Sequence, residues 1–354
     1  MTTEEKIIKA LSRVMDPELH RSLNDLGMVR DIQLQEGTAK VTIALTVPEC
    51  PLKDRIVSDV KTAVLQVEGV HQVLVELGEM SAKEKRRIGP ATPDEAGAAE
   101  TFNRIQRVVA VMSGKGGVGK SSVTALLATA LAKAGNRIGI LDADITGPSI
   151  PKLFGLTVKP PMTPFGILPA ESARGIKIMS INLMLENEDQ AVIWRGPLIS
   201  SAVKQFWGDV YWGELDWLVV DLPPGTSDAV LTVMQSLPLF GVLLVTSPQS
   251  LAELVVRKAA RMAQAMEVPM LGLVENMSYF LCPDNNKRYD IFGTGRGEEL
   301  AALLNIPFLA RLPLDPVLSQ LCDAGRVEEY PSEALTGVVQ HLQEYAPRPH
   351  RPSL

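Results

Sequence analysis

The segment from Ser113 to Ser121 has the composition and spacing of a phosphate-binding loop, G-x-x-x-x-G-K-[ST]. Its glycines let backbone N–H groups curl around phosphate oxygens, and the start of the following helix adds its positive end. We expect Lys120 to reach the outer phosphates and the Ser121 hydroxyl to hold Mg²⁺. The residues expected to contact the nucleotide here are Gly114, Lys115, Gly116, Gly117, Val118, Gly119, Lys120, Ser121 and Ser122.

Acidic side chains follow two other apolar runs at the points where those runs end. Asp142 and Asp144 close one run, and Asp221 closes another. Ligands of open α/β sheets bind at the carboxyl ends of strands, so we expect these carboxylates to lie beside the phosphate loop. There Asp142 and Asp221 could help to bind Mg²⁺. Asp142 and Asp144 together could also orient the attacking water. A helix cap or a turn is the alternative use of Asp142 and Asp144.

Apolar strands alternate with amphipathic helices over residues 105–345. Runs such as 217–220 and 241–245 are hydrophobic without interruption, which suits strands buried on both faces of a parallel sheet. The sequence therefore predicts an α/β fold in which a doubly wound parallel sheet carries the phosphate loop. The expected strands are residues 107–112, 137–142, 176–181, 217–221, 241–246, 270–275 and 307–312.

A small α+β domain is expected in front of the phosphate-loop domain, over residues 1–80. Apolar stripes near 7–14 and 56–67 indicate helices, and the runs 29–35 and 38–46 indicate a pair of strands. The following stretch is charged and rich in proline and small residues, which is typical of a linker. The predicted plan is a domain at 1–80, a linker at 81–104, a phosphate-loop (P-loop) domain at 105–345 and a tail at 346–354.

Composition limits the partners and the compartment. The chain of 354 residues has a net charge of −6 and a pI near 5.4, which offers no general basic surface for nucleic acid. No apolar run reaches the length of a membrane span, and the first residues lack the apolar region of a signal peptide. Three cysteines are an odd number for a disulfide framework. We therefore expect a cytoplasmic protein that binds neither nucleic acid nor membrane.

The second lysine of the loop, Lys115, indicates a narrower class, because an ordinary phosphate loop needs no lysine there. This version resembles the deviant Walker motif of the family that contains MinD, ParA and the nitrogenase iron protein. The resemblance implies that Lys115 reaches the nucleotide of a partner subunit and that the working unit is a homodimer. It also implies that Asp144 positions the attacking water and that Asn276 contacts the base, which makes the nucleotide ATP. A solvated loop lysine is the alternative for Lys115.

Further segments resemble the Mrp/ApbC family of P-loop ATPases that carry iron–sulfur clusters. The resemblance covers essentially all of residues 105–325 and implies slow ATP hydrolysis by a carrier that serves iron–sulfur scaffold and recipient apoproteins. The segments that carry it are Asp142–Pro151, Trp194–Pro197, Trp217–Gly225 and Val274–Ser278.

The N-terminal region resembles the small iron–sulfur assembly domain that is often fused to Mrp proteins. The matching segments are Asp16–Glu18, Asp25–Gly27 and Thr46–Pro51. In that domain the cysteine of the Cys-Pro pair, here Cys50, is the reactive position. A helix that starts just after Cys50 would lower the pKa of its thiol and favour the thiolate. A small buried apolar cysteine is the alternative.

One position departs from the family pattern. Members that bridge a [4Fe–4S] cluster between protomers use Cys-x-x-Cys, whereas this chain has Cys282 followed by Asn285. A dimer then offers two thiolates rather than four, and the amide of asparagine is a poor ligand for the iron of such clusters. Either Cys50 joins as a ligand, or the cluster is labile, or none is carried. The rival hypotheses are an ATPase scaffold without a cluster and a MinD- or ParA-like positioning ATPase.

Overall fold

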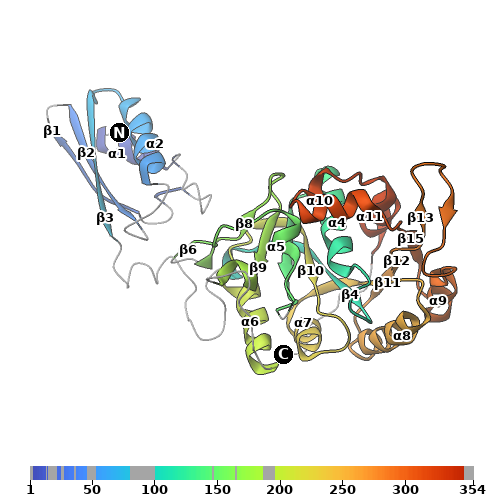
Figure 1. Ribbon diagram of the computed structural model, residues 1–354. Coiled ribbons are helices and arrows are strands. Elements are labelled where there is room, and N and C mark those ends of the chain that lie inside the picture. Colours follow the sequence, from blue (N-terminus) through green and yellow to red (C-terminus); the bar gives the residue numbers. More distant parts are fainter. Residues whose placement is uncertain are drawn as a thin grey trace. The chain divides into compact units, whose positions relative to one another are not determined.

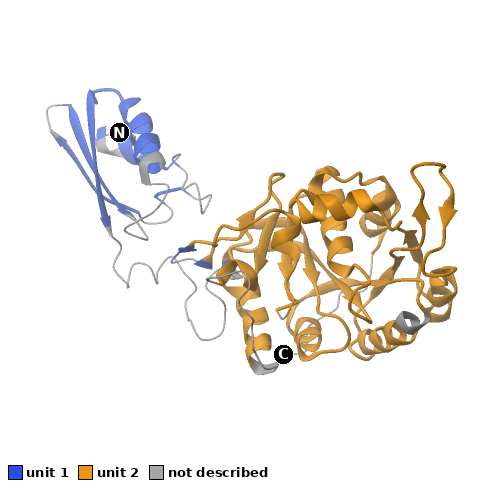
Figure 2. Ribbon diagram, in the orientation of Figure 1, with its two compact units in different colours: residues 1–101, 162–166 blue, residues 102–161, 167–354 orange. Residues whose placement is uncertain are grey.

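The computed structural model describes residues 3–12, 14, 22–24, 28–35, 37–45, 53–79, 100–145, 147–163, 166–185 and 196–346 (Figure 1). The chain divides into two compact units (Figure 2). Unit 1 comprises residues 1–101 and 162–166, and unit 2 comprises residues 102–161 and 167–354. Within the described ranges, no helix combines the length and the apolar character that crossing a membrane requires.

Unit 1 contains a three-stranded sheet with the order β1-β2-β3 and helices on it. Strands β1 and β2 are antiparallel, whereas β2 and β3 are parallel. Apolar residues at helical spacing, such as Ile7 and Leu11 in α1 and Val60 and Val64 in α2, are fully buried. The predicted small α+β fold is therefore confirmed. The elements are α1 (Thr3–Leu11), β1 (Val29–Gln35), β2 (Thr38–Leu45), α2 (Lys53–Leu65) and β3 (Gln72–Glu79).

Unit 2 is built on an eight-stranded sheet with the order β15-β12-β11-β4-β10-β5-β9-β8. Neighbouring strands are parallel except at the β8 edge, where β8 runs antiparallel to β9. All the strands predicted in this region are present, so the doubly wound parallel sheet is confirmed. The strands are β4 (Arg104–Ser113), β5 (Ile138–Asp142), β8 (Ala170–Glu171), β9 (Lys177–Ser180), β10 (Glu214–Asp221), β11 (Leu239–Thr246), β12 (Met270–Glu275) and β15 (Phe308–Arg311).

Helices cover both faces of this sheet, as Figure 1 shows. Helices α4, α5, α10 and α11 enclose one apolar core with the sheet, and α6, α7, α8 and α9 enclose the other. Both faces of the central strands are buried, which explains their uninterrupted apolar sequence. The helices are α4 (Lys120–Lys133), α5 (Ile150–Leu153), α6 (Gly196–Gly208), α7 (Asp228–Ser236), α8 (Ser250–Ala265), α9 (Gly297–Leu304), α10 (Pro316–Asp323) and α11 (Thr336–Glu344).

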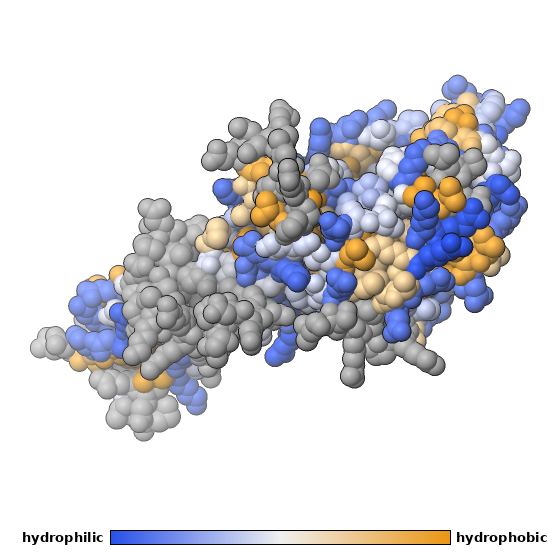
Figure 3. Space-filling model, turned by 90° about the horizontal axis from the view of Figure 1, so that it is seen from below, coloured by the Kyte–Doolittle hydropathy of each residue, from blue (hydrophilic) through white to orange (hydrophobic). Residues whose placement is uncertain are grey.

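Several short elements lie outside the two larger sheets. Two small two-stranded pairs stand apart from the main sheet: β6 with β7, and β13 with β14, which is antiparallel. The sequence analysis predicted neither pair, because strands of two residues leave no periodic signal. The face in Figure 3 is mainly hydrophilic, with hydrophobic side chains in separate small patches. The short elements are η1 (Glu100–Phe102), β6 (Met162–Thr163), β7 (Gly166–Ile167), η2 (Ile181–Met184), β13 (Phe280–Leu281), β14 (Arg288–Tyr289), η3 (Val327–Glu329) and η4 (Glu333–Leu335).

Candidate functional site

The predicted phosphate loop joins the end of β4 to the start of α4, in the middle of the main sheet. Gly117 and Gly119 have φ angles of 80° and 77°, in the left-handed region that favours glycine. A Cβ at Gly114 would collide with the backbone of Val256 in α8, so the loop lies directly against that helix. Gly116 and Gly117 are exposed. Because helix α4 begins at Lys120, its first N–H groups are available to an anion at this loop.

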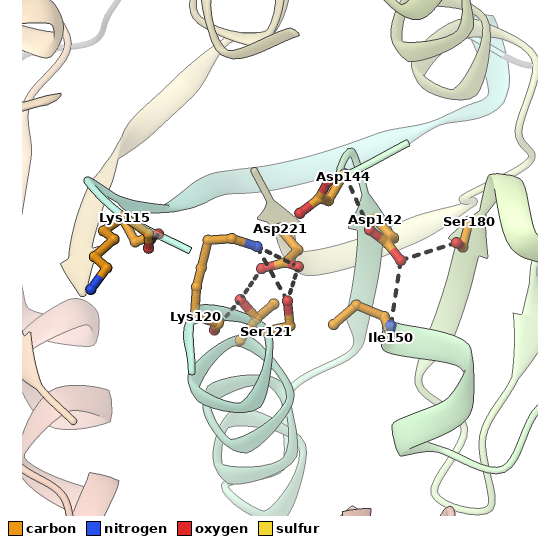
Figure 4. Close-up of polar contacts among 10 residues, drawn as sticks. Lys115, Lys120, Ser121, Asp142, Asp144, Ile150, Ser180 and Asp221 are labelled. Carbon is orange, nitrogen blue, oxygen red and sulfur yellow. Dashed lines mark hydrogen bonds and ion pairs between the residues drawn. The ribbon is translucent and has the colours of Figure 1, made fainter. Parts of the chain in front are cut away.

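A buried ion pair lies beneath the loop. The Nζ of Lys120 is 2.7 Å from Oδ2 of Asp221, and the Ser121 hydroxyl donates to the same oxygen at 2.6 Å (Figure 4). Asp221 is fully buried and the Lys120 side chain is 6% exposed. The structure thus brings together the loop lysine, the loop serine and the aspartate at the end of β10, as the sequence analysis expected. Their binding of phosphate and Mg²⁺ stays a prediction.

Thr124 completes the environment of Asp221, and the sequence analysis missed it. Its hydroxyl donates to Oδ1 of Asp221 at 2.7 Å. Thr124 lies one helical turn after Lys120, so both side chains project from the same face of α4. That spacing was the available signal for its role. Each oxygen of the Asp221 carboxylate therefore has at least one hydroxyl donor.

We expect Thr124→Val to lower the free energy of unfolding by about 1–3 kcal/mol, because it leaves a buried carboxylate oxygen without its donor. Urea denaturation would measure the change. Thr129→Val is the matched control, since Thr129 is buried on the same helix and its hydroxyl has no hydrogen-bond partner among the described residues. Equal effects of the two substitutions would show that the Thr124 contact contributes nothing.

Asp142 lies at the end of β5, next to Asp221 across the β5–β10 pair. Its carboxylate is fully buried and accepts hydrogen bonds from the Ser180 hydroxyl at 3.0 Å and from the Asp144 N–H at 3.2 Å. Burial, followed by the charge of Asp221, raises the pKa of Asp142 to about 8, although Lys120 opposes the shift. Figure 4 shows Asp142, Asp144 and Asp221 together at the carboxyl ends of their strands. Their roles toward Mg²⁺ and water stay predictions.

The raised pKa of Asp142 predicts a pH dependence of stability in protein free of Mg²⁺ and nucleotide. Between the ordinary pKa of 3.8 and about 8, the unfolded chain has released this proton while the folded chain retains it. The free energy of unfolding should therefore fall as pH rises through that window. Asp142→Asn should flatten this part of the profile, measured by urea denaturation. An unchanged slope in the variant would show that Asp142 is not the titrating group.

Lys115 points away from the cluster around Asp221 (Figure 4). Its Nζ donates to Oε1 of Gln249 at 3.1 Å, at the start of α8. Its side chain is half-buried rather than fully solvated. The two lysines of the loop thus have different partners: Lys120 forms an ion pair with Asp221, and Lys115 donates a hydrogen bond to Gln249. The role of Lys115 in a partner subunit stays a prediction.

Asn276 follows β12 and is 4% exposed. Its Nδ2 donates to the carbonyl oxygen of Val118 at 3.0 Å, inside the phosphate loop. A Cβ on Gly119 would collide with this amide, so the fit between the two is tight. The structure therefore places Asn276 against the phosphate loop. Its predicted contact with the base of a nucleotide stays a prediction.

Cys282 lies on the turn between β13 and β14 and is partly exposed. Backbone hydrogen bonds between Cys282 and both Asn286 and Lys287 close this turn, and Asn285, at the position of the second cysteine, accepts a further hydrogen bond from the Lys287 N–H at 2.9 Å. Among the described residues, no group of three or more His, Cys, Asp or Glu side chains could hold a metal ion. Cys322 is buried in α10. Cys50 and Arg195 lie outside the described residues.

Comparison with known proteins places this geometry in a family. The family described as NUBPL iron-transfer P-loop NTPase matches residues 104–345. The chain belongs to this family. A second family, described as iron-sulfur cluster assembly protein, matches residues 4–75. The predicted pairing of a P-loop NTPase with an iron–sulfur assembly domain is confirmed.

Relatives match over almost the whole chain. The chain is 40% identical over 353 residues to an iron-sulfur cluster carrier protein of Synechocystis sp., with 97% of each chain covered. It is 41% identical over 349 residues to a protein of the same name from Deinococcus radiodurans, covering 96% of this chain and 94% of that one. A solved nucleotide-binding protein in complex with ADP from Archaeoglobus fulgidus is 46% identical, with a TM-score of 0.59, covering 70% of this chain and 95% of that one.

Proposed function

We propose that this protein is an ATP-hydrolysing carrier that binds iron–sulfur clusters and delivers them to recipient apoproteins. One observation carries the proposal: the end of strand β12 connects the phosphate loop, which would bind the nucleotide, to the hairpin with Cys282, which would bind the cluster. Asn276 contacts the phosphate loop through Val118, and the chain then runs directly into the hairpin that holds Cys282. The family membership and the names of the relatives support the same function.

The residues of the phosphate loop fit a magnesium nucleotide. Ser121 and Asp221 present hard oxygen donors within 2.6 Å of each other, which is the donor type that Mg²⁺ prefers. Bound there, Mg²⁺ would neutralise phosphate charge. Lys120 would exchange its pairing with Asp221 for the outer phosphates, and Asp144 would orient the attacking water. The ADP bound to the Archaeoglobus relative supports nucleotide binding at this fold.

We further propose that the working unit is a homodimer in which Lys115 acts on the nucleotide of the partner. The support is geometric, because Lys115 lies on Gln249 and away from the Lys120 cluster of its own subunit. A dimer also brings together two copies of Cys282, and one thiolate alone cannot hold a cluster. The odd number of cysteines supports a reducing, cytoplasmic compartment.

Cluster binding by the purified chain tests the proposal. Anaerobic reconstitution with iron and sulfide should give about four irons per dimer and the visible absorption of a [4Fe–4S] cluster. Mixing with a purified apo-ferredoxin should transfer the cluster, and MgATP should change the transfer rate. A reconstituted protein that retains no iron would contradict the carrier function.

An ATPase scaffold that carries no cluster is the second candidate function. It is favoured by the asparagine at position 285, where the family pattern has a second cysteine. The Oδ1 of Asn285 accepts a hydrogen bond from the Lys287 N–H and is therefore not available to an iron atom. Such a protein would retain nucleotide hydrolysis and would act through Cys50. The iron count of the reconstituted protein separates the two candidates.

A further inference from the structure

Both ends of the hairpin that carries Cys282 meet at one buried carboxylate. The hairpin, residues 279–296, leaves the sheet after β12 and returns at the start of α9, and it contains β13 and β14 (Figure 1). We call it the cysteine hairpin. Glu275, the last residue of β12, is 1% exposed and lies between its two ends. The proposed function gives this glutamate no role.

The contacts of Glu275 reach each end of the cysteine hairpin separately. At the entry, the Ser278 hydroxyl donates to Oε2 of Glu275 at 2.7 Å. At the exit, the Gly297 N–H donates to Oε1 at 2.7 Å. Arg311 of β15 lies with its Nε 3.4 Å from Oε2 and supplies a neighbouring positive charge. One side chain thus fixes where the hairpin leaves the domain and where it returns.

At the exit of the cysteine hairpin, the backbone packs closely against the Glu275 carboxylate. A Cβ at Gly295 would collide with the Glu275 carboxylate, and a Cβ at Gly297 would come 2.9 Å from Oε1. Glycine at both positions lets the backbone approach the carboxylate that closely. A displacement of Glu275 would therefore move the backbone around Gly295 and Gly297, because no flexible side chain lies there to absorb it.

The residue after Glu275 holds the phosphate loop. Asn276 donates from Nδ2 to the Val118 carbonyl and packs on Gly119 so closely that a Cβ there would collide with it. The next residue, Met277, has a φ of 54°, a conformation that non-glycine residues rarely adopt. A tight turn over 275–278 therefore connects the phosphate loop to the cysteine hairpin through short, buried contacts.

We propose that Glu275 is a positioning residue that couples the phosphate loop to the cysteine hairpin and so links the nucleotide state to Cys282. A shift of Val118 and Gly119 on nucleotide binding would move Asn276, and Glu275 would pass the movement to both ends of the hairpin. The inference rests on the proposed function, because it assigns the regulation of the proposed cluster-binding thiol to named side chains.

The test follows the reactivity of Cys282 in the full-length, cluster-free protein under anaerobic conditions. Iodoacetamide alkylation of Cys282 is timed by mass spectrometry of the peptide, with and without MgATP. In the wild type we expect MgATP to change the rate by about fivefold, the lower end of usual coupling between sites. Ser278→Ala and Glu275→Gln should reduce the change to below about twofold while ATP affinity stays within about threefold of wild type. Ser278→Thr, which keeps the hydroxyl, should retain the response.

The chain offers a matched control for a lost serine–glutamate hydrogen bond. The Ser172 hydroxyl donates to Oε1 of Glu328 at 2.7 Å, and both residues are buried. Ser172→Ala and Glu328→Gln should leave the nucleotide response of Cys282 intact. If Ser278→Ala responds like Ser172→Ala, or if the wild type shows no response, the inference is wrong. Iron retention by the same wild-type preparation reports on the carrier function independently of that result.

Discussion

Lys120→Ala is expected to lower the rate of ATP hydrolysis by about 10²–10³-fold, the usual effect of removing one group that stabilises charge in a transition state. Lys120 projects from the first turn of α4, and its Nζ lies 2.7 Å from Asp221 at the edge where a phosphate would enter. Release of phosphate from MgATP measures the rate. ATP binding should weaken as well, because the lysine contributes charge to the ground state and to the transition state.

The control for this substitution is Lys133→Ala. Lys133 is an exposed lysine in the last turn of the same helix, and its Nζ donates to the Tyr330 carbonyl at 2.8 Å. Lys133→Ala changes the net charge by the same amount as Lys120→Ala but should leave the rate of ATP hydrolysis near that of the wild type. Lys120→Ala leaves the buried Asp221 carboxylate without its ion-pair partner, although the hydroxyl donors Ser121 and Thr124 remain, so circular dichroism should first confirm that the variant is folded. Hydrolysis at the wild-type rate in Lys120→Ala would contradict the assignment of the nucleotide site.

The same variant separates hydrolysis from delivery. If hydrolysis drives delivery, a cluster reconstituted on Lys120→Ala should no longer pass to an apo-ferredoxin at the wild-type rate. Normal transfer without hydrolysis would show that the nucleotide and the cargo act independently. The coupling through Glu275 would then have no function in delivery, even if the hairpin responds to ATP.

The main sheet of unit 2 could be predicted because its signal is local and strong. Residues 217–220 of β10 and 241–245 of β11 are uninterrupted hydrophobic runs, and both runs are buried on both faces of the sheet. The phosphate loop is equally local, since its glycines, its lysine and its serine are consecutive residues. The pairs β6–β7 and β13–β14 escaped prediction because they depend on turns and tertiary contacts rather than on periodicity.

The functional site could be predicted only in part, for the same reason. The sequence indicates that Asp142 and Asp221 end strands, but the partner of Asp142 is Ser180, which comes from the adjacent strand β9. Thr124 had a signal in its helical spacing from Lys120. Glu275 ends a predicted strand as Asp142 and Asp221 do, but that position gave no sign of its contacts with Ser278 and Gly297, which converge on it only in the folded chain. Contacts between distant segments therefore account for what the sequence analysis missed.

The second large effect is expected from Cys282→Ala, which should abolish the iron that the wild type retains after reconstitution. Cys282 is the partly exposed cysteine among the described residues, and the proposed dimer would contribute two such thiolates to one cluster. Iron counting and the visible absorption spectrum of anaerobically reconstituted protein measure the loss. ATP hydrolysis should persist, because Cys282 lies on the hairpin and not in the phosphate loop.

Cys322→Ala is the matched control for the loss of iron. Burial raises the pKa of the Cys322 thiol, which disfavours the thiolate that a cluster needs, so its removal should leave the iron count unchanged. Asn285→Cys is the opposite test. It adds a second thiol to each hairpin and should slow the loss of iron to a chelator, although it also removes the side-chain acceptor of the Lys287 N–H.

The outcomes of these variants decide which ligands hold the cluster. If Cys282→Ala loses its iron and Asn285→Cys retains iron more firmly, the cluster is bound at the hairpin. The two other ligands of the cluster in the wild type then come from elsewhere in the chain, and Cys50 is the first residue to substitute in the search for them. Retention of iron by Cys282→Ala would place the cluster away from the hairpin. In that case the coupling between Glu275 and the cysteine hairpin would play no part in the release of a cluster.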